Sequence, residues 1–306
     1  MSLVSIIIPC YNGEAYVGDA INGALEQTHC EVEVIVVDDG STDNSLKVIQ
    51  SFGDRIRCLS GPNRGACAAR NWGFEESNGE FIQFFDADDL IHREKIQRQL
   101  AVLVGSDNTL VFSLHEVTSF DQTTSTNQWN RRDDPSDAIR FMFAGDLPTP
   151  APLHRRSLVE RIGGWREDLE CAQDRDFHLR LAMSGVRFER VDDVLFTIRR
   201  RRGSIGMSSV SKIHTRRAEL AIMAAENLIS AGSWNSVRSH ECAAMISNAA
   251  RGLVLSSPSD AREWFRQAKK IHPSGGIAKV YSPIGLVLRR CFGSRITEFL
   301  HRKVRS

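Results

Sequence analysis

Hydrophobic runs and amphipathic segments alternate through the first part of the chain. Runs rich in Val, Ile and Phe have the length of buried strands, and the segments between them repeat their apolar residues at helical spacing. This order predicts an α/β fold with a mostly parallel sheet covered by helices on both faces. The predicted strands are Val4–Ile8, Glu33–Val37, Ile56–Leu59, Phe81–Phe85 and Thr109–Ser113, and the predicted helices are Ala15–Gln27, Gly65–Ser77, His92–Val104 and one that carries Leu46 to Phe52 after a cap at Ser41 or Thr42.

The second part of the chain begins with the polar segment Thr118–Pro135, which predicts a loop or an irregular hairpin. Three prolines between Leu147 and Leu153 predict a break in regular structure. From about Ser211 the pattern is helical only, so we predict one domain over 1–208, with halves at 1–115 and 116–208, and a helical C-terminal region over 209–306. The elements predicted here are helices at Asp137–Ala144, Leu158–Arg161, Asp174–Ser184, Ile213–Ala231, Val237–Leu255 and Asp260–Ile271, and strands at Val186–Val191 and Val194–Ile198.

Composition limits which partners and which cellular location fit this protein. The formal net charge is +1, from 39 Lys and Arg against 38 Asp and Glu. This balance argues against a nucleic-acid partner, which needs a basic excess. The seven cysteines are scattered without a C-x-x-C pair, which favours a reducing compartment over a disulfide framework. With neither a signal peptide nor a membrane span in the pattern, we expect a cytoplasmic protein.

The tail Pro283–Arg305 combines an apolar stripe with many basic residues. Two interpretations stay open for it. An interfacial helix on anionic lipid has this composition, and would place the protein peripherally at the inner face of the membrane. The same composition fits a closing helix that packs its apolar stripe on the preceding helices and exposes its charges to water.

Unusual polar residues follow three of the predicted strands. Tyr11 comes after the first strand, Asp39 after the second and the run Asp86-Ala87-Asp88-Asp89 after the fourth. Ligands of open parallel sheets bind beyond the carboxyl ends of the strands, so these residues should share one rim. A pyrimidine base could stack on the aromatic ring, and its imide N–H could donate a hydrogen bond to the neighbouring carboxylate.

The three aspartates after the fourth strand are close enough to repel one another and raise each other's pKa values. A cation would relieve that repulsion, and hard carboxylate oxygens suit Mg²⁺ or Mn²⁺ shared with substrate phosphates. The alternative is a favourable interaction with the N-terminal dipole of the following helix. The presence of the other strand-end residues favours the metal site.

Further along the chain, two basic and one acidic group are candidates for the same site. Arg70 lies on a helix of small and apolar residues, where it either makes a surface salt bridge or contacts the base edge or the diphosphate. Asp174 or Asp176 could be a general base, or either could simply favour a helix N-terminus. The run Arg199–Arg202 is either a solvated face or a clamp for a diphosphate.

These motifs together resemble glycosyltransferase family 2, whose members are inverting enzymes of the GT-A fold. The resemblance extends from Val4 to about Ser209. It is carried by four blocks in the family's order and spacing, and by a fifth block on the acceptor side. The blocks are Ser5–Asn12, Val36–Asp43, Asn63-Arg64-Gly65 with Ala69-Arg70-Asn71, the D-x-D-like segment Phe85–Asp89, and Gly163-Gly164-Trp165 followed by Gln173–Phe177.

The resemblance implies transfer of a sugar from a nucleoside-diphosphate sugar, with a UDP-linked donor expected, to an acceptor hydroxyl, with inversion and with Mn²⁺ or Mg²⁺ as cofactor. It also implies partners: a saccharide, lipid-linked or other hydroxyl acceptor, in surface polysaccharide or glycoconjugate synthesis. In the implied site Tyr11 and Asp39 contact the base with support from Arg70, Asp86 faces the ribose, Asp88 binds the metal and Asp174 is the catalytic base. Pro9, Glu14 and Asn63 complete the implied donor-nucleotide site, and Arg201 and Arg202 are the candidate diphosphate contacts.

The chain departs from the family pattern at two places. Gln173 stands where the family usually has a Glu before the base, which puts a helper contact in doubt. Arg201-Arg202 precede Gly203-Ser204 where the family often has a metal-binding His, and an arginine that stays protonated cannot bind a metal. These departures keep a non-catalytic nucleotide-sugar-binding protein as an alternative. A sugar nucleotidyltransferase fits less well, because the segment after the first strand is not a Gly-rich phosphate loop.

Overall fold

The computed structural model describes residues 2–29, 31–103, 107–118, 124–127, 134–200 and 210–277. By its internal packing the chain divides into two units. The first consists of Met1–Ala138 and Leu147–Arg202, and contains the β-sheet. The second consists of Ile139–Asp146 and Gly203–Ser306, and its described residues are mainly helical.

The strands of the first unit follow the order β3-β2-β1-β4-β8-β6-β9-β5, and β7 pairs with β6. The first four strands in this order are parallel, whereas β8 is antiparallel to both of its neighbours. The sheet is therefore mixed: its first half is parallel, whereas in its second half β6 and β9 are parallel to each other and β8, β5 and β7 are antiparallel to their neighbours. The strands are β1 (Val4–Cys10), β2 (Val32–Asp39), β3 (Arg57–Gly61), β4 (Phe81–Phe84), β5 (Leu90–Ile91), β6 (Thr109–Thr118), β7 (Thr124–Asn127), β8 (Pro152–Arg155) and β9 (Arg187–Arg199).

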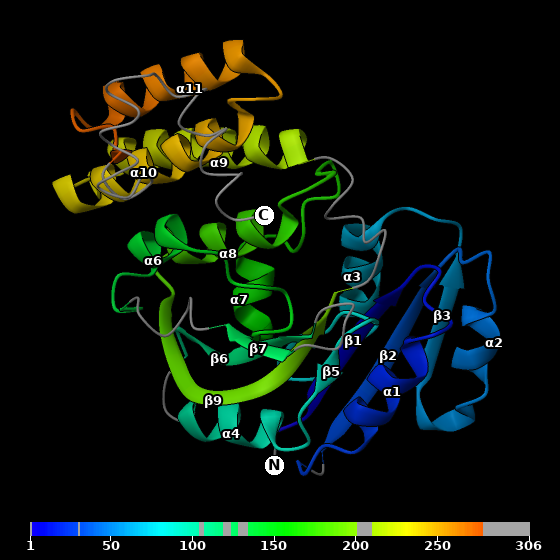
Figure 1. The fold of residues 1–306 in the computed structure, drawn as a ribbon. Helices are drawn as coiled ribbons and strands as arrows, with labels where there is room; N and C mark the ends of the chain where they lie inside the picture. The colour runs from blue at the N-terminus through cyan, green and yellow to red at the C-terminus, as the bar shows by residue number, and fades with distance from the viewer. Residues whose placement is uncertain are drawn as a thin grey trace. The chain divides into compact units, whose positions relative to one another are not determined.

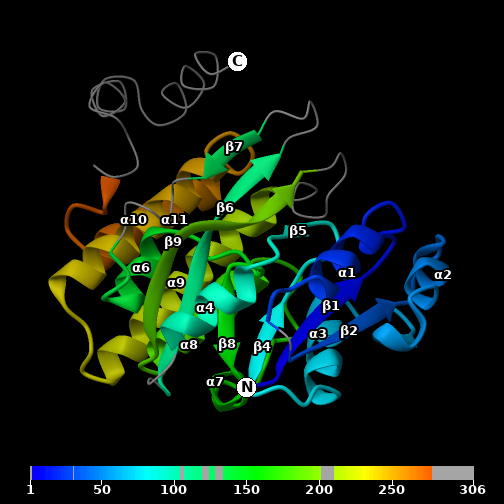
Figure 2. The ribbon, with the colours of Figure 1, turned by 90° about the horizontal axis from the view of Figure 1, so that it is seen from below.

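Helices cover both faces of the parallel half (Figures 1 and 2). Successive crossovers run in one direction, from β1 through α1 to β2 and through α2 to β3, and the next crossover reverses direction through α3 to β4. Crossovers between parallel strands follow a right-handed rule, so helices before and after such a reversal lie on opposite faces. This reversal places α3 on the face opposite α1 and α2. The helices of this unit are α1 (Val17–Leu25), α2 (Ser45–Gln50), α3 (Ala66–Glu75), α4 (Lys95–Leu103), α7 (Arg156–Arg161) and α8 (Gln173–Met183), with a 3-10 turn at Gly53–Arg55.

Aromatic packing joins α8 to the middle of the sheet. Phe177 stacks on Trp165 with 4.1 Å between ring centroids, and both rings meet Phe84 of β4 edge-on. Phe84 and Phe177 are fully buried. Because such rings contribute large buried areas, this cluster fixes the start of α8 against β4.

The sequence missed one strand and made two wrong local predictions. Residues 145–151, with Pro148 and Pro150, interrupt regular structure as predicted, but β8 begins at Pro152 and lies between β4 and β6. The two strands predicted at Val186–Ile198 are one strand, β9, whose pairing with β6 shifts register at Ser113/Leu114. The residue before α2 is Asn44, not Ser41 or Thr42.

The second unit packs its long helices around a small apolar core of its own. The buried members include Ala250, Leu253 and Phe265. Its helices are most of α6 (Ala138–Ala144), together with α9 (Val210–Ser230), α10 (Ser236–Leu253) and α11 (Pro258–Ile271). The segment that contains α6 is linked to α9 by an ion pair of 2.6 Å between Arg217 and Asp146. None of the helices among the described residues is long and apolar enough to cross a membrane. The tail Pro283–Arg305, for which a lipid-binding helix and a packed closing helix were both considered, lies outside the described residues.

A buried histidine pair predicts how the stability of the first unit depends on pH. His154 of β8 and His178 of α8 are fully buried, with nearly parallel rings 5.6 Å apart. Burial lowers the pKa of His178 from 6.5 to about 3, and burial followed by repulsion from His178 lowers the pKa of His154 well below its usual value. Both histidines are therefore neutral in the folded chain at a pH where the unfolded chain binds protons.

Because the folded pKa values are depressed, the stability of this unit is fully present above pH 6.5 and decreases as the pH falls below it. Each histidine should cost about 1.4 kcal/mol of unfolding free energy per pH unit between the unfolded and folded pKa values. Urea unfolding at several pH values between neutral and mildly acidic should show this slope. His178→Leu should reduce the slope by one histidine's share, and His92→Gln, at an exposed position, should leave it unchanged. Equal slopes in the wild type and His178→Leu would contradict the interpretation.

Candidate active site

The carboxyl ends of β1, β2 and β4 lie at one edge of the sheet. β1 pairs with β2 on one side and with β4 on the other, so the chain's order reverses between β1 and β4. This is the topological switch point at which open α/β sheets bind ligands. Tyr11 follows β1, Asp39 is the last residue of β2 and Asp86 lies shortly after β4, so all three are at this edge as predicted, and Tyr11 is 42% exposed.

The loop after β1 is held by the loop after β2. Asn12, with a left-handed φ of 50°, accepts a 2.8 Å hydrogen bond from the Thr42 backbone N–H, and its own N–H donates to the Ser41 hydroxyl at 3.0 Å. Ser41 therefore fixes the neighbouring loop instead of capping α2. Tyr11 is therefore exposed on a loop that is fixed to the neighbouring loop.

Glu14, in the loop after β1, contacts the residue that precedes α2. Its Oε2 accepts hydrogen bonds of 2.8 and 3.0 Å from the backbone N–H and side-chain amide of Asn44. Glu14 is thus a structural partner of the α2 N-terminus, and a donor contact would have to use its remaining acceptor positions. Pro9, half-buried in β1, lies in register with Val37 of β2.

Asp39 holds the loop that leads into α3. Its two carboxylate oxygens accept the backbone N–H groups of Arg64 and Gly65, at 2.8 and 2.9 Å, and the residue is only 6% exposed. Each oxygen keeps a second acceptor position, so this role is compatible with one further hydrogen bond to a base. Asn63 lies beside this loop: a Cβ added to Gly40 would come within 2.6 Å of the Asn63 backbone nitrogen, which requires glycine there.

The turn after β4, residues Asp86–Asp89, concentrates negative charge as expected. Asp89 is 3% exposed, and its pKa is raised well above the usual value by burial, followed by the charges of Asp86 and Asp88. Its carboxylate accepts a 3.1 Å hydrogen bond from the Arg199 backbone N–H. We refer to Asp86–Asp89 as the acidic turn.

The acidic turn suits a divalent cation that brings other ligands with it. Within the described part of the chain no group of three or more His, Cys, Asp or Glu is arranged to hold a metal ion. Mg²⁺ and Mn²⁺ do not need such a group, since they commonly bind through one or two carboxylates, water and substrate phosphates. The crowded carboxylates of the turn therefore fit a metal that is shared with a diphosphate.

Arg70 is buried and joins the acidic turn to α8. Its guanidinium donates to Asp86 at 2.8 Å and to the Gln173 side-chain oxygen at 3.4 Å, and it lies 4.7 Å from the Trp165 ring centre. With 6% exposure it is not the surface salt bridge considered from the sequence. Gln173, one of the two departures from the family pattern, is thus a neutral partner of this buried cation.

The two candidate bases have different surroundings. Asp176 is 1% exposed, and its Oδ2 accepts a 2.8 Å hydrogen bond from Arg180 one turn later. Asp174 is half-buried in the first turn of α8, which begins at Gln173, directly after Ala172 in a left-handed conformation with φ of 56°. Asp176 therefore belongs to the packing of α8, and Asp174 is the better candidate for proton transfer.

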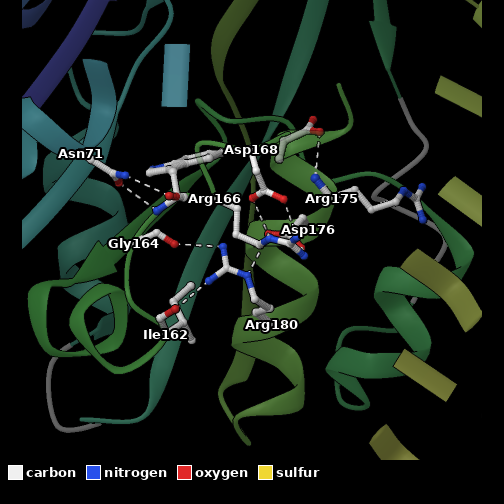
Figure 3. A network of polar contacts seen from close by, with 10 residues as sticks. Asn71, Ile162, Gly164, Arg166, Asp168, Arg175, Asp176 and Arg180 are labelled. Atoms are coloured by element: carbon white, nitrogen blue, oxygen red, sulfur yellow. Dashed lines mark hydrogen bonds and ion pairs between the residues drawn. The ribbon is translucent and has the colours of Figure 1, made fainter. Parts of the chain in front are cut away.

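Arg180 and Asn71 hold the loop before α8 in place (Figure 3). Arg180 donates to the carbonyls of Ile162 and Gly164 at 2.7 and 2.9 Å, while Asn71 of α3 both accepts from the Trp165 backbone N–H and donates to its carbonyl. The role of Arg180 was not predicted from the sequence. The i, i+4 spacing of Asp176 and Arg180 was the available signal. Arg201 and Arg202, the predicted diphosphate contacts, lie outside the described residues.

The chain matches the model of a known protein family. The model described as glycosyl transferase family 2 matches residues 5–161, which is more than half of the chain. The chain belongs to this family.

Curated relatives extend the similarity beyond the matched segment. One of them, from Rickettsia typhi (strain Wilmington), is named an uncharacterized glycosyltransferase; it is 33% identical over 196 residues, which cover 61% of this chain and 61% of the relative. The chain spans less than two thirds of the length of the first relatives that it matches.

Solved structures share the fold. The crystal structure of S. aureus TarS 1–349 in complex with UDP-GlcNAc superposes with a TM-score of 0.70 at 19% identity, over 98% of this chain and 92% of TarS 1–349. The mannosyltransferase PcManGT from Pyrobaculum calidifontis, in complex with GDP-Man and Mn²⁺, superposes with a TM-score of 0.56 at 19% identity, over 99% of this chain and 86% of the mannosyltransferase. The predicted GT-A-like fold with a helical C-terminal region is therefore confirmed.

Proposed function

We propose that this chain is a glycosyltransferase that moves a sugar from a UDP-linked donor to an acceptor hydroxyl, with inversion and with the assistance of Mn²⁺ or Mg²⁺. The observation that carries the proposal is the convergence of Tyr11, Asp39 and the acidic turn at the switch point of the sheet. Arg70 connects this rim to Gln173, the first residue of the helix that carries Asp174. Membership of the family and the nucleotide sugars bound by the two similar structures support the same function.

The donor half of the proposed site recognises the nucleotide. Tyr11 offers an exposed ring against which a base can stack, and Asp39 has acceptor positions for its imide N–H. Asp86, held by Arg70, faces the ribose. Pro9, Glu14 and Asn63 form the remaining walls of the nucleotide site, with Glu14 acting mainly through its hold on Asn44.

The reaction itself requires a proton acceptor and compensation of charge. Asp174 accepts the proton of the acceptor hydroxyl as that oxygen attacks the anomeric carbon from the face opposite the leaving group. Asp88 holds the divalent cation, which, when bound, stabilises the negative charge of the departing nucleoside diphosphate. Arg201 and Arg202 contribute further positive charge to the same phosphates. A single displacement of this kind inverts the anomeric centre.

The acceptor is a saccharide, lipid-linked or other hydroxyl compound of surface polysaccharide or glycoconjugate synthesis. In this proposal residues 1–208 carry the chemistry, with the donor in 1–115 and the acceptor in 116–208, and residues 209–306 form a helical C-terminal region. A cytoplasmic location, peripheral at the inner face of the membrane, would bring the chain to a lipid-linked acceptor.

One observation favours a non-catalytic donor-binding protein as second candidate. The Arg70 partner at position 173 is a neutral amide, where the family usually has a carboxylate. Hydrolysis of the nucleotide sugar in the absence of acceptor separates the two functions. An enzyme should release nucleoside diphosphate at a rate that depends on Asp174, whereas a binding protein should release none.

A thermal-shift screen of nucleotide sugars with and without Mn²⁺ tests the proposed function. A ligand at one hundred times its dissociation constant should stabilise the fold by about 2.7 kcal/mol, which raises the melting temperature by a few degrees. We expect the largest shift with a UDP-sugar and Mn²⁺ together, and a smaller one with either alone. If no nucleotide sugar changes the melting temperature at millimolar concentration, the proposed function is wrong.

A further inference from the structure

Arg199, the last residue of β9, contacts the acidic turn at Asp88 and Asp89, whereas Arg70 contacts it at Asp86. Its Nε donates to the main-chain carbonyl of Asp88 at 2.6 Å, and its backbone N–H donates to the Asp89 carboxylate at 3.1 Å. Its side chain is 20% exposed. Arg199 therefore holds the turn by its main chain and by its buried carboxylate, at the two residues that follow Ala87.

The same guanidinium also contacts the beginning of α1. Nη1 donates to Asp19 at 2.7 Å, Nη2 donates to the Tyr16 carbonyl at 3.4 Å, and the guanidinium carbon lies 5.1 Å from the centre of the Tyr16 ring. The backbone N–H groups of Tyr16 and Val17 both donate to the Gly13 carbonyl at 2.9 Å. α1 thus starts directly from the loop that carries Tyr11, and Arg199 joins that loop's helix to the acidic turn.

The strand that follows the acidic turn pairs with the strand that ends in Arg199. Leu90 and Ile91 of β5 follow the turn and pair antiparallel with Thr197 and Phe196 of β9. The turn is therefore held by β4 where it begins and by β9 where it ends. Arg199 completes the second attachment, because its contacts reach back to Asp88 and Asp89.

The geometry of arginine explains why one side chain can serve both segments. A guanidinium has donors in fixed directions within a plane, so one group can hold a carbonyl, a carboxylate and an aromatic ring in fixed positions. Its charge is paired with Asp19, at 2.7 Å, and its bond to Asp88 goes to the main-chain oxygen. The contact therefore orients Asp88 without using the Asp88 carboxylate.

We propose that Arg199 is a positioning residue that fixes the acidic turn relative to the loop after β1, and so sets where Asp88 presents its carboxylate to a divalent cation. The proposal deepens the proposed function and rests on it for the assignment of Asp88 to the metal. The contacts themselves do not depend on that assignment, so the movement of the turn and the binding of the metal can be measured separately.

The test compares Arg199→Gln with Arg190→Gln in the full chain. Arg190 lies on the same strand and has an ion pair of the same length, 2.7 Å, with Asp192. The first measurement is hydrogen exchange of residues 86–91 in the absence of ligand. The second is the Mn²⁺ concentration that gives half of the thermal stabilisation in the presence of a saturating UDP-sugar.

We expect Arg199→Gln to speed exchange in residues 86–91 by about tenfold and to raise the half-saturating Mn²⁺ concentration by about the same factor, which is the size of effect of losing a hydrogen bond to a charged group. Arg190→Gln should change neither. Asp19→Asn, at a side chain that is 59% exposed, should shift both in the same direction by about two- to threefold. The Asp19→Asn variant also provides the test if Arg199→Gln does not fold.

Unchanged exchange in residues 86–91 in a folded Arg199→Gln protein would overturn the proposal, as would an equal effect of Arg190→Gln. When Arg199→Gln does not fold, the absence of any effect in Asp19→Asn has the same meaning. If Arg199→Gln speeds the exchange but the wild type binds no nucleotide sugar, then the positioning of the turn stands and the proposed function fails.

Discussion

Asp174→Asn should lower glycosyl transfer by about two or more orders of magnitude, which is the usual contribution of a general base. Asparagine has nearly the same shape as aspartate but cannot accept a proton at neutral pH. Because the proposed role of Asp174 is proton transfer from the acceptor and not contact with the nucleotide, donor affinity should be unchanged. Initial rates with a saturating donor, together with a thermal-shift titration of the same donor, measure both quantities.

Asp176→Asn is the matched control, since it makes the same change two residues later on the same helix. Asp176 is buried and bonded to Arg180, so its loss should destabilise the fold, by about 3 kcal/mol, and leave the activity of the folded fraction intact. If Asp176→Asn is the inactive variant and Asp174→Asn transfers sugar normally, the base has been assigned to the wrong aspartate.

Asp88→Ala should reduce transfer by about two to three orders of magnitude, the equivalent of the several kcal/mol that a cation contributes to stabilising a leaving group. The variant should still fold, because the Arg199 contact to residue 88 is made with the main-chain carbonyl. Its affinity for the nucleotide sugar should fall to the value that the wild type shows without metal. Turnover and donor binding, each measured with Mn²⁺ and with a chelator, separate these two effects.

Asp107→Ala is the control for Asp88→Ala, since Asp107 is a fully exposed carboxylate that lies 3.7 Å from Arg155, away from the acidic turn. It should leave both quantities unchanged. Full metal-dependent activity in Asp88→Ala would remove Asp88 from the metal site and leave the other carboxylates of the turn as candidates.

The rim of the site could be predicted because parallel strands end at one edge of a sheet. Once the strands before Tyr11, Asp39 and Asp86 were recognised from their apolar runs, their convergence followed from topology alone. The contacts made at that rim could not be predicted. Asp39 binds the Arg64 and Gly65 N–H groups, and Glu14 binds Asn44, because loops that follow different strands approach one another in space.

The acceptor side of the site shows the same limit. The local pattern left both Asp174 and Asp176 open as the base, since both fit the start of a helix, and only the family resemblance favoured Asp174. Burial and the Arg180 contact distinguish them in the structure. β8 was missed because a strand of four residues that starts at a proline has no local signal, and its place between β4 and β6 depends on strands far away in the chain.

By itself the sequence determined the α/β order, the helical C-terminal region and the identity of the strand-end residues, because apolar periodicity and turn residues act over a few positions. Only the tertiary structure decided that Arg70 is buried between Asp86 and Gln173, and that Arg199 joins the acidic turn to α1. These pairs are far apart in the chain. Their geometry depends on how the sheet brings strand ends together, and a local pattern of residues does not contain that information.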